Sequence, residues 1–385
     1  MRFSLGGLGF GRSIREGFGI VRSVELFTGC GGLGLGLARA GFRHELMVEW
    51  DRDAVETILH NRAKGVEHVE HWPIRRSDVR EIDWREYAGA DLVAGGPPCQ
   101  PFSIGGKHRG VDDHRDMWPQ AIRAVREIRP SAFLFENVRG LMRPKFAGYL
   151  QSIVEGLKNP SRDLGYEVRV IQVNAADFGA AQKRHRVIIA GFRSDMLTGP
   201  IPEPEPTHSR ARLLWDQFVT GEYWDQHSMK RSLDSFEKVD ANTVHRLRKD
   251  SVEPMGDRWV SVRDKFVGLG EPDGLGNHIF QPGAKTYKGH TGSPLDQPAK
   301  ALKAGDHGVP GGENMMVLSG GGVRYFSIRE AARLQGLPDE YAFPGSWSES
   351  MRQLGNAVPC ELAEAMGRWA SGILTAMREK LPIAA

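Results

Sequence analysis

The chain has 385 residues, of which 40% are hydrophobic and 26% are charged, and its formal net charge is +3. No apolar run approaches the ~20 residues of a membrane span, and the first residues lack the apolar core of a signal peptide, so we expect a cytoplasmic protein without membrane contact. Cys30, Cys99 and Cys360 are odd in number and far apart, which argues against a disulfide framework and against a zinc site. We therefore expect no bound metal.

Short apolar runs alternate with amphipathic stretches in the first half of the chain. In one such stretch, Ala121, Val125 and Ile128 are spaced to share one face of a helix. This alternation predicts an α/β fold with a mostly parallel sheet covered on both faces, in which ligands collect beyond the carboxyl ends of the strands. The expected strands are residues 24–27, 45–49, 91–94, 132–136, 168–173 and 186–192.

The alternation stops at the proline-rich residues 199–209, which we interpret as a linker. From there to about Gly322 the sequence is rich in Gly, Pro, Trp and His, and it predicts a second, irregular domain of short strands and long loops. A capping box of Ser327 and Glu330 predicts a helix that stops at Pro338. The residues from about 345 onward are predicted to be helical and to return to the first domain.

A glycine-rich turn, TGCGGLGLG, follows the first expected strand. Gly29, Gly31 and Gly34 match the pattern GxGxxG, and Glu49 lies about twenty residues later, where a ribose-binding carboxylate is expected. Trp50 offers a stacking face for adenine, and Asp78, in SDVRE beyond the next expected helix, is a candidate acceptor for the adenine amino group. By itself the turn is compatible with a nicotinamide, a flavin, S-adenosylmethionine or a purely structural role.

Two polar motifs lie at the ends of expected strands, ENV where one strand finishes and QKRHRV where another begins. Glu136, in ENV, leaves its strand at the sheet rim, where partial desolvation favours the protonated form that can donate a proton; the alternative is a helix cap. In QKRHRV, Arg184 and Arg186 alternate by two, so we expect both on one face of an extended segment. Paired guanidinium groups suit a phosphate or a carbonyl, and the alternative is an exposed strand entry.

The stretch GGPPCQPFS places Cys99 directly behind two prolines. Pro98 fixes its own φ and biases Pro97 towards an extended form, so the cysteine has little freedom. On its own the stretch is either a tight loop with an incidental thiol or a loop that holds a nucleophilic cysteine in position. Gly105 and Gly106, a few residues later, are suited to hinge a closing loop.

Taken together, the motifs resemble one enzyme family. ELFTGCGGLGLGL, VEWD, GGPPCQPFS, ENV, QKRHRV and QLGNAVP stand in the order found in DNA cytosine-5 methyltransferases of the bacterial restriction-modification type. The resemblance implies a Rossmann-like, S-adenosylmethionine-dependent methyltransferase domain and a smaller, irregular target-recognition domain. The expected divisions are an N-terminal extension at 1–22, a catalytic and cofactor-binding domain at 23–196, a target-recognition domain including the return helix at 197–344, and a C-terminal segment returning to the catalytic domain at 345–385.

The resemblance also implies roles for individual residues. Cys99 would attack carbon 6 of a flipped-out cytosine, Glu136 would hydrogen-bond ring nitrogen 3, and Arg186, with Arg184 behind it, would hold the base carbonyl. The implied cofactor contacts are Phe27, Gly29, Gly31, Gly32, Glu49, Trp50, Asp78, Val79, Pro98, Asn356 and Val358. The implied DNA contacts are Gln100, Ser103, Lys107, His108 and Arg109.

The expected partner is double-stranded DNA, read by a surface centred on residues 289–316. A cognate restriction or defence system is a further expected partner, and we expect the enzyme itself to be a monomer. A tRNA cytosine-5 methyltransferase is the nearest alternative, but such enzymes usually carry a Cys-Phe-Thr tripeptide, and no cysteine lies between Cys99 and Cys360. A catalytically inactive DNA-binding relative would lack one or more of the catalytic residues. An adenine amino-methyltransferase would carry an Asp/Asn-Pro-Pro-Tyr/Phe motif, and a nicotinamide-dependent enzyme leaves Cys99 and QKRHR without a joint role.

Overall fold

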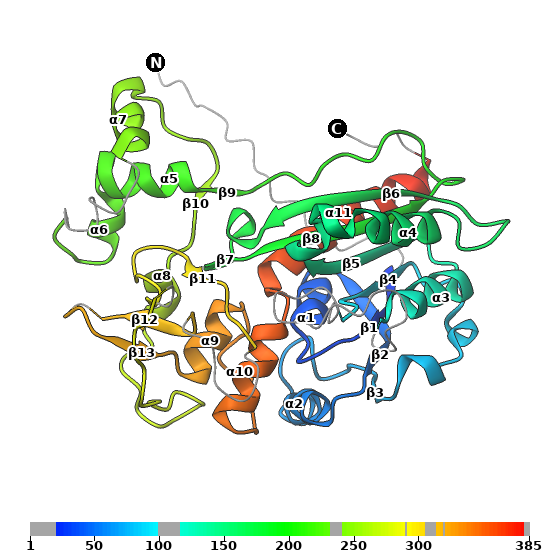
Figure 1. Cartoon of the computed structure of the whole chain (residues 1–385), viewed down its shortest axis with the longest axis horizontal. Helices are drawn as coiled ribbons and strands as arrows, with labels where there is room; N and C mark the ends of the chain where they lie inside the picture. The colour runs from blue at the N-terminus through cyan, green and yellow to red at the C-terminus, as the bar shows by residue number, and fades with distance from the viewer. Residues whose placement is uncertain are drawn as a thin grey trace, which may run out of the picture.

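The computed structural model describes residues 21–98, 116–231, 241–288, 291–304, 313–318 and 320–380. Figure 1 shows two lobes side by side, one built around a twisted sheet and the other made of short helices, short strands and loops. The predicted linker is extended from residue 200 to 207 and lies along the first lobe, where Trp369 Nε1 donates to the carbonyl oxygen of Pro202 at 3.1 Å. The expected N-terminal extension lies almost wholly outside the described residues.

The first lobe contains a seven-stranded sheet in the order β3-β2-β1-β4-β5-β8-β6. The pairs β1–β2, β1–β4, β2–β3 and β4–β5 are parallel, whereas β8 runs antiparallel to both β5 and β6. The α/β class and the mostly parallel sheet are therefore confirmed, and all six expected runs are strands. The strands are β1 Val21–Leu26, β2 Phe42–Glu49, β3 Ile74–Arg76, β4 Leu92–Gly95, β5 Ala132–Val138, β6 Tyr166–Asn174 and β8 His185–Arg193.

Alternate residues of the central strands belong to different hydrophobic cores, because side chains alternate across a strand. Leu134 packs on one face with α1 and α11, whereas Phe133 and Phe135 pack on the other face with α3 and α4. Both faces of the sheet are thus covered, as the long apolar runs predict. The helices of this lobe are α1 Gly32–Arg39, α2 Arg52–Ala63, α3 Trp118–Ile128, α4 Ala147–Lys158 and α11 Cys360–Glu379.

The second lobe is more helical than expected. Its helices have five to ten residues each, too few turns to give a clear period of 3.6. The helices are α5 Arg210–Trp215, α6 Glu222–Gln226, α7 Ala241–Asp250, α8 Val262–Phe266 and α9 Ile328–Leu334, and α10 Trp347–Asn356 lies between this lobe and the first (Figure 1). The strands are β9 His208–Ser209, β10 Asp257–Arg258, β11 Ala299–Lys300, β12 Met315–Val317 and β13 Val323–Tyr325, and β7 Gln182–Lys183 of the first lobe pairs with β11.

The predicted capping box opens α9. The Ser327 side chain accepts from the backbone N–H of Glu330, and the Glu330 carboxylate accepts from the backbone N–H of Ser327. The helix ends at Leu334, four residues before the predicted stop at Pro338. It stops early because the backbone turns at Gly336, where φ is +76°.

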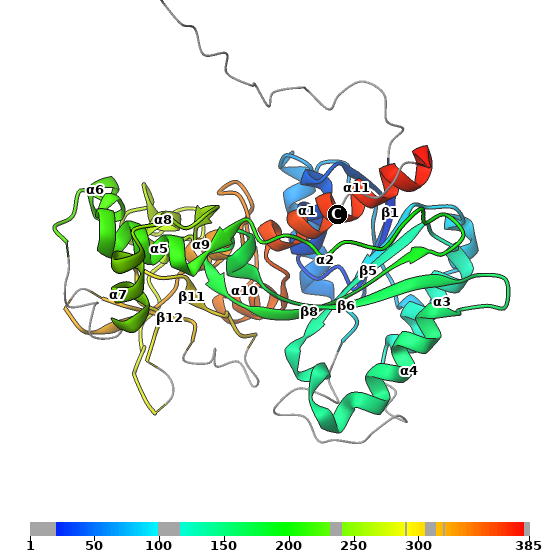
Figure 2. The ribbon, with the colours of Figure 1, turned by 90° about the horizontal axis from the view of Figure 1, so that it is seen from above.

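The last helix, α11, packs against α1 at the opposite end of the chain (Figure 2). A Cβ added to Gly36 of α1 would lie 2.3 Å from the Cβ of Ala363 and 2.6 Å from the carbonyl oxygen of Cys360, so the two helices approach closely at this glycine. The end of the chain thereby completes the core beneath the glycine-rich turn. Within the described residues, no helix has the length and apolar character needed to cross a membrane.

Candidate active site

The turn between β1 and α1 has a backbone that favours glycine. Gly29 and Gly31 have φ of +57° and +86°, and Phe27 also has a positive φ of +59°. A Cβ on Gly31 would lie 2.5 Å from the ring of Trp72, and a Cβ on Gly32 would lie 2.3 Å from the carbonyl oxygen of Val358. The turn therefore needs glycine both for its conformation and for its close packing.

Glu49 ends β2 and points its carboxylate towards this turn. Oε2 accepts from the backbone N–H of Gly29 at 2.7 Å, and Oε1 accepts from the N–H groups of Trp50 and Asp51 at 2.9 and 2.8 Å. Burial raises the pKa of this carboxyl above its ordinary value. The next side chain, Trp50, is 70% exposed, so a fixed carboxylate stands beside a free aromatic face.

Asp78 and Val79 follow β3 at the same edge of the sheet. The Asp78 carboxylate caps the short 3-10 turn Val79–Glu81 and forms an ion pair with Arg80 at 2.5 Å, and that hydrogen-bonded guanidinium lowers the pKa of Asp78. Val79 is buried. Any adenine amino group at Asp78 would therefore share the carboxylate with Arg80.

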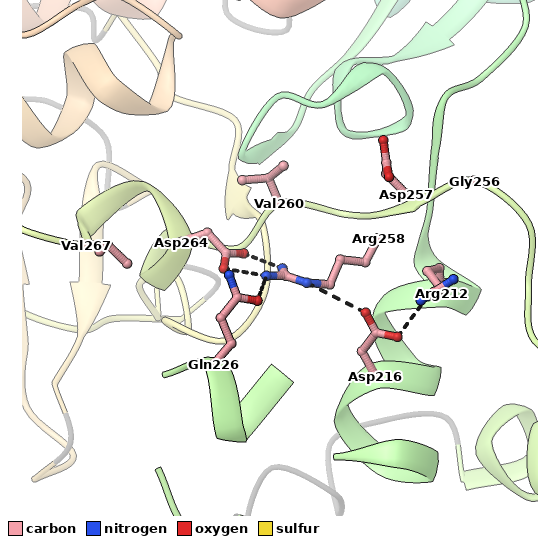
Figure 3. A pocket seen from close by; sticks show the side chains of 9 residues that line it. All are labelled: Arg212, Asp216, Gln226, Gly256, Asp257, Arg258, Val260, Asp264 and Val267. Carbon is pink, nitrogen blue, oxygen red and sulfur yellow. Dashed lines mark hydrogen bonds and ion pairs between the residues drawn. The ribbon is translucent and has the colours of Figure 1, made fainter. Parts of the chain in front are cut away.

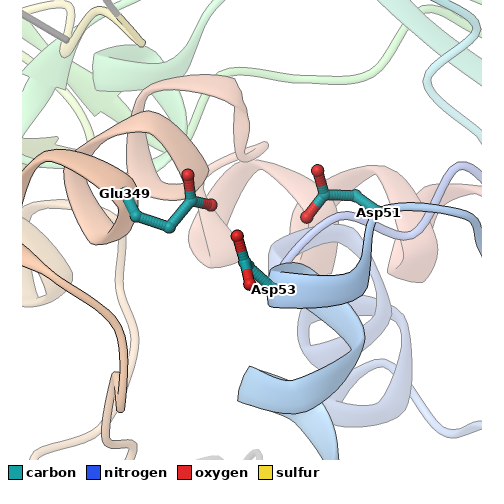
Figure 4. Close-up of side chains that lie close together, drawn as sticks. All are labelled: Asp51, Asp53 and Glu349. Atoms are coloured by element: carbon teal, nitrogen blue, oxygen red, sulfur yellow. The ribbon is translucent and has the colours of Figure 1, made fainter.

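Helix α10, which lies far along the sequence, reaches the edge of the sheet where the glycine-rich turn and Asp51 lie. It ends at Asn356, which is exposed, and Val358 is buried against Gly32. Three carboxylates lie together beside this helix: Asp51, Asp53 and Glu349 (Figure 4). Arg352 donates to Asp51 at 2.8 Å and to Glu349 at 2.6 Å. This guanidinium neutralises part of the cluster and ties α10 to the residues that follow Glu49.

The residues that lead from the end of β4 towards Cys99 are closely packed and hydrogen-bonded. A Cβ on Gly95 would lie 2.4 Å from the carbonyl oxygen of Leu26, and a Cβ on Gly96 would lie 3.4 Å from Oε2 of Glu136. Asn137 Nδ2 donates to the carbonyl oxygen of Pro97 at 3.0 Å. Pro98 is the last described residue of this segment and is exposed. The predicted residues Cys99, Gln100, Ser103, Lys107, His108 and Arg109 lie outside the described residues.

Glu136 and Arg186 form an ion pair between Glu136 Oε1 and Arg186 Nε. They sit on the neighbouring antiparallel strands β5 and β8, where Val138 is the register partner of Arg186. Both side chains are largely buried, and Arg186 also donates to the carbonyl oxygen of His185 at 2.8 Å. The structure therefore places a carboxyl and a guanidinium together beside Gly96, three residues before Cys99.

The two arginines of QKRHRV have different bonding partners. Arg184 precedes β8, is 1% exposed, and donates to the carbonyl oxygens of Leu302 and Gly355, both at 2.8 Å. Only Arg186 contacts Glu136 through an ion pair among the described residues. Arg184 instead joins three distant segments, because the strand entry is covered by the second lobe and by α10.

Sequence reasoning missed two polar side chains that shape the site. Asn137 holds Pro97, as described above, and Gln182 Nε2 donates to the carbonyl oxygen of Leu334 and to Oε1 of Gln335 at 2.8 and 2.9 Å. Both lie inside motifs, ENV and QKRHRV, but neither amide has a chemistry of its own that would have drawn attention to it. Their role is to fix backbone groups, which spacing alone does not reveal.

A polar hollow of about 530 Å³ lies in the second lobe (Figure 3). Its charges are paired with one another: Arg258 binds Asp264 at 2.6 Å and Gln226 at 2.8 Å, and Arg212 binds Asp216 at 2.8 Å. Asp257 also lines it. Because its charged groups bind one another, we assign this hollow a structural role. Glu136 and Arg186 are not among the residues that line it.

The family model for C-5 cytosine-specific DNA methylases matches residues 21–370 of this chain. The chain belongs to this family. It is accordingly an S-adenosylmethionine-dependent enzyme that methylates carbon 5 of cytosine in double-stranded DNA. Among curated relatives, the Type II methyltransferase M.NgoMIV of Neisseria gonorrhoeae is 32% identical over 355 residues, which are 90% of this chain and 96% of that protein. The Type II methyltransferase M.Eco47II of Escherichia coli is also 32% identical, over 90% of this chain and 77% of that protein.

Solved structures support the fold. A putative DNA modification methyltransferase encoded within a prophage of E. coli has a TM-score of 0.53 at 24% identity, covering 92% of this chain and 99% of that one. The Dnmt2 methyltransferase of S. pombe has a TM-score of 0.57 at 17% identity, covering 93% and 99%. At these identities the likeness concerns the fold, and it agrees with a Rossmann-like methyltransferase sheet.

Proposed function

We propose that the chain methylates cytosine within a specific duplex DNA sequence through a covalent bond between Cys99 and the base. The observation that carries the proposal is the Glu136–Arg186 ion pair beside Gly96, on the rim that leads directly to Cys99. A carboxyl that can donate a proton and a guanidinium that can bind a carbonyl are what an attack on a cytosine ring requires.

The other two cysteines favour Cys99 as the nucleophile. Cys30 and Cys360 are fully buried in the core. Burial raises the pKa of the Cys30 thiol to about 12 and raises that of Cys360 as well. A thiol of such high pKa carries almost no thiolate at neutral pH, and the thiolate is the reactive form.

In the proposed reaction, Cys99 Sγ forms a bond to carbon 6 of the cytosine. The electron pair of the carbon 5–carbon 6 double bond moves onto carbon 5, which becomes nucleophilic. Glu136 donates a hydrogen bond to ring nitrogen 3 and offsets the charge that develops there, while Arg186 binds the carbonyl at carbon 2. After carbon 5 has been methylated, a base removes its proton, the double bond re-forms and Sγ leaves.

The cofactor supplies an electrophilic methyl group on a sulfonium centre. The described residues fit it: the Glu49 carboxylate is held by three backbone N–H groups at the position for two ribose hydroxyls, and the Trp50 indole is exposed for adenine. The remaining residues that we propose to hold the cofactor are Phe27, Gly29, Gly31, Gly32, Asp78, Val79, Pro98, Asn356 and Val358.

Attack on carbon 6 is blocked inside a stacked duplex, so the proposal includes extrusion of the cytosine from the helix. The proposed DNA contacts beside Cys99 are the residues that follow it: Gln100, Ser103, Lys107, His108 and Arg109.

Because the relatives named above are Type II methyltransferases, we further propose that the enzyme works with a cognate restriction or defence system. We expect it to act as a monomer.

The covalent step is tested with duplex DNA that contains 5-fluorocytosine, because fluorine on carbon 5 cannot be removed as a proton. Wild-type protein should form an adduct that survives denaturing electrophoresis, and Cys99→Ala should form none and should not methylate ordinary DNA. Persistent methylation by Cys99→Ala would refute the mechanism.

Labelled methyl transfer onto tRNA, measured beside duplex DNA, tests the alternative substrate. Bisulfite sequencing of DNA from expressing cells identifies the target sequence.

A further inference from the structure

Two lysines stand opposite each other where the two lobes meet. Strand β7 of the first lobe pairs in parallel with β11 of the second, and the register partner of Lys183 is Lys300 (Figure 1). Register partners on adjacent strands point to the same face of a sheet, so the two ammonium groups share one face. Like charges in this arrangement are destabilising.

The strand pair is held firmly in spite of this repulsion. The backbone N–H of Ala299 donates to the carbonyl oxygen of Ala181 at 2.8 Å, and that of Lys300 donates to Ser293 Oγ at 3.0 Å. Gln182 and Arg184, on either side of Lys183, are anchored by the buried bonds described above. The hydrogen bonds of the neighbouring residues therefore fix the backbone positions of the two lysines.

A third cation, Arg210, belongs to the same group. It is the first residue of α5 and is exposed. Burial lowers the pKa of Lys183, and the positive charges of Arg210 and Lys300 lower it further. The Lys183 Nζ donates to Gln297 Oε1 at 3.3 Å and the Lys300 Nζ to Thr291 Oγ1 at 2.9 Å, and both acceptors are neutral.

Some cations of the second lobe are paired with carboxylates. Arg263 binds Asp296 at 2.6 Å, and Lys303 binds Glu313 at 2.7 Å. In the part of the chain that the structure describes, no ion pair with a carboxylate involves Lys183, Arg210 or Lys300. These three charges thus lie together at the junction of the lobes without a carboxylate partner, which indicates an anionic ligand.

We propose that Lys183, Lys300 and Arg210 bind a backbone phosphate of the substrate DNA at the junction of the two lobes. Lys183 lies three residues before Arg186, so a phosphate here would be bound close in the chain to the proposed catalytic pair. The two lysines come from different lobes, and one phosphate would therefore bind to both. The proposal rests on DNA as the substrate and does not depend on the covalent step at Cys99.

The test measures DNA affinity against salt concentration with the full chain. Lys183→Gln, Lys300→Gln and the double variant are compared with wild type by fluorescence anisotropy of a labelled duplex, and Lys64→Gln, an exposed lysine at the end of α2, is the matched control. Removal of one phosphate-binding charge should reduce the slope of log affinity against log salt by about 0.9. The reduction in affinity should be similar for duplexes with and without the target sequence, and the KM for S-adenosylmethionine should not change.

Thermal stability separates a binding role from a structural one. Removal of one lysine relieves the repulsion, so the Tm of Lys300→Gln should equal or exceed that of wild type while its DNA affinity falls. A double variant with the wild-type salt slope, or one that loses no more affinity than Lys64→Gln, would overturn the proposal. Inorganic phosphate at millimolar concentration serves as a second probe: if it raises the Tm of wild type and displaces no DNA, the site binds free phosphate instead.

Discussion

The Arg186 guanidinium forms an ion pair with the Glu136 carboxylate across the antiparallel strands β8 and β5, at the rim that leads to Cys99. The two side chains that the proposed mechanism assigns to ring nitrogen 3 and to the base carbonyl are thus held next to each other. Each would contact the cytosine only if the other stays in position, so the pair is expected to act as a unit.

Substitution of either partner of this pair should slow methyl transfer. We expect Glu136→Gln and Arg186→Ala each to lower kcat by roughly 10²-fold, because one removes the proton donor and the other its positioning partner. The double variant should lose much less than the product of the two effects, since the residues act as a unit. Single-turnover methylation measures this, and strictly multiplicative losses would show that the two side chains act independently.

We expect substitution of Arg184 to lower the stability of the fold, whereas substitution of Arg186 should mainly lower the rate of methyl transfer. Arg184→Ala leaves the carbonyl oxygens of Leu302 and Gly355 without their donor, so we expect the free energy of unfolding to fall by about 3 kcal/mol. Arg169→Ala, which removes an exposed ion pair on β6, should cost less than about 1 kcal/mol. Urea denaturation compares the two. Equal costs would mean that the buried guanidinium does not stabilise the junction of the lobes.

The close approach of α1 and α11 predicts opposite effects for two glycines. Gly36→Ala places a Cβ within 2.3 Å of Ala363, so it should destabilise the fold by about 1–3 kcal/mol as the helices are forced apart. Gly372, within α11, has no heavy atom within 4 Å of an added Cβ. Gly372→Ala should therefore stabilise by about 0.5–1 kcal/mol, because alanine favours the helix. Thermal melts of both variants test the prediction, and a stabilised Gly36→Ala would contradict it.

His44 should make the fold sensitive to mild acid. Its Nε2 bonds to the carbonyl oxygen of Gly34 at 3.0 Å and its Nδ1 to Ser23 Oγ at 2.9 Å, and burial lowers its pKa to about 4. The unfolded chain, with a histidine pKa near ~6.5, binds more protons between these values, so stability should fall as pH drops from about 6.5 to 4, by a total on the order of 3 kcal/mol.

The pH dependence of urea unfolding tests the role of His44. His44→Gln should flatten the dependence in this range because glutamine does not titrate. His60→Gln, which changes an exposed histidine of α2, should keep the wild-type profile. If His44→Gln and wild type lost stability in parallel between pH 6.5 and 4, another group would be responsible.

Local patterns determined much of the fold and the motif set. Long apolar runs such as AFLF predict buried strands because a strand covered on both faces has no polar side, and the Ser327–Glu330 box predicts a helix start because both partners lie within one turn. Strand β3, with three residues, and the helices between residues 210 and 266, with five to ten, were missed because short elements show no clear period. Cys99, Glu49 and Glu136 were predicted as site residues from motif order, which needs no three-dimensional information.

Only the tertiary structure decided which of these residues meet. Spacing by two predicted one extended segment for Arg184 and Arg186, but it did not reveal their partners: Arg184 binds carbonyl groups 118 and 171 residues away, and Arg186 pairs with Glu136. The register of β5 against β8 and the return of α10 to the first lobe determine these contacts. The opposition of Lys183 and Lys300, 117 residues apart in sequence, is of the same kind. A sequence specifies side-chain chemistry locally, but the partner of a long-range contact depends on how the whole chain packs.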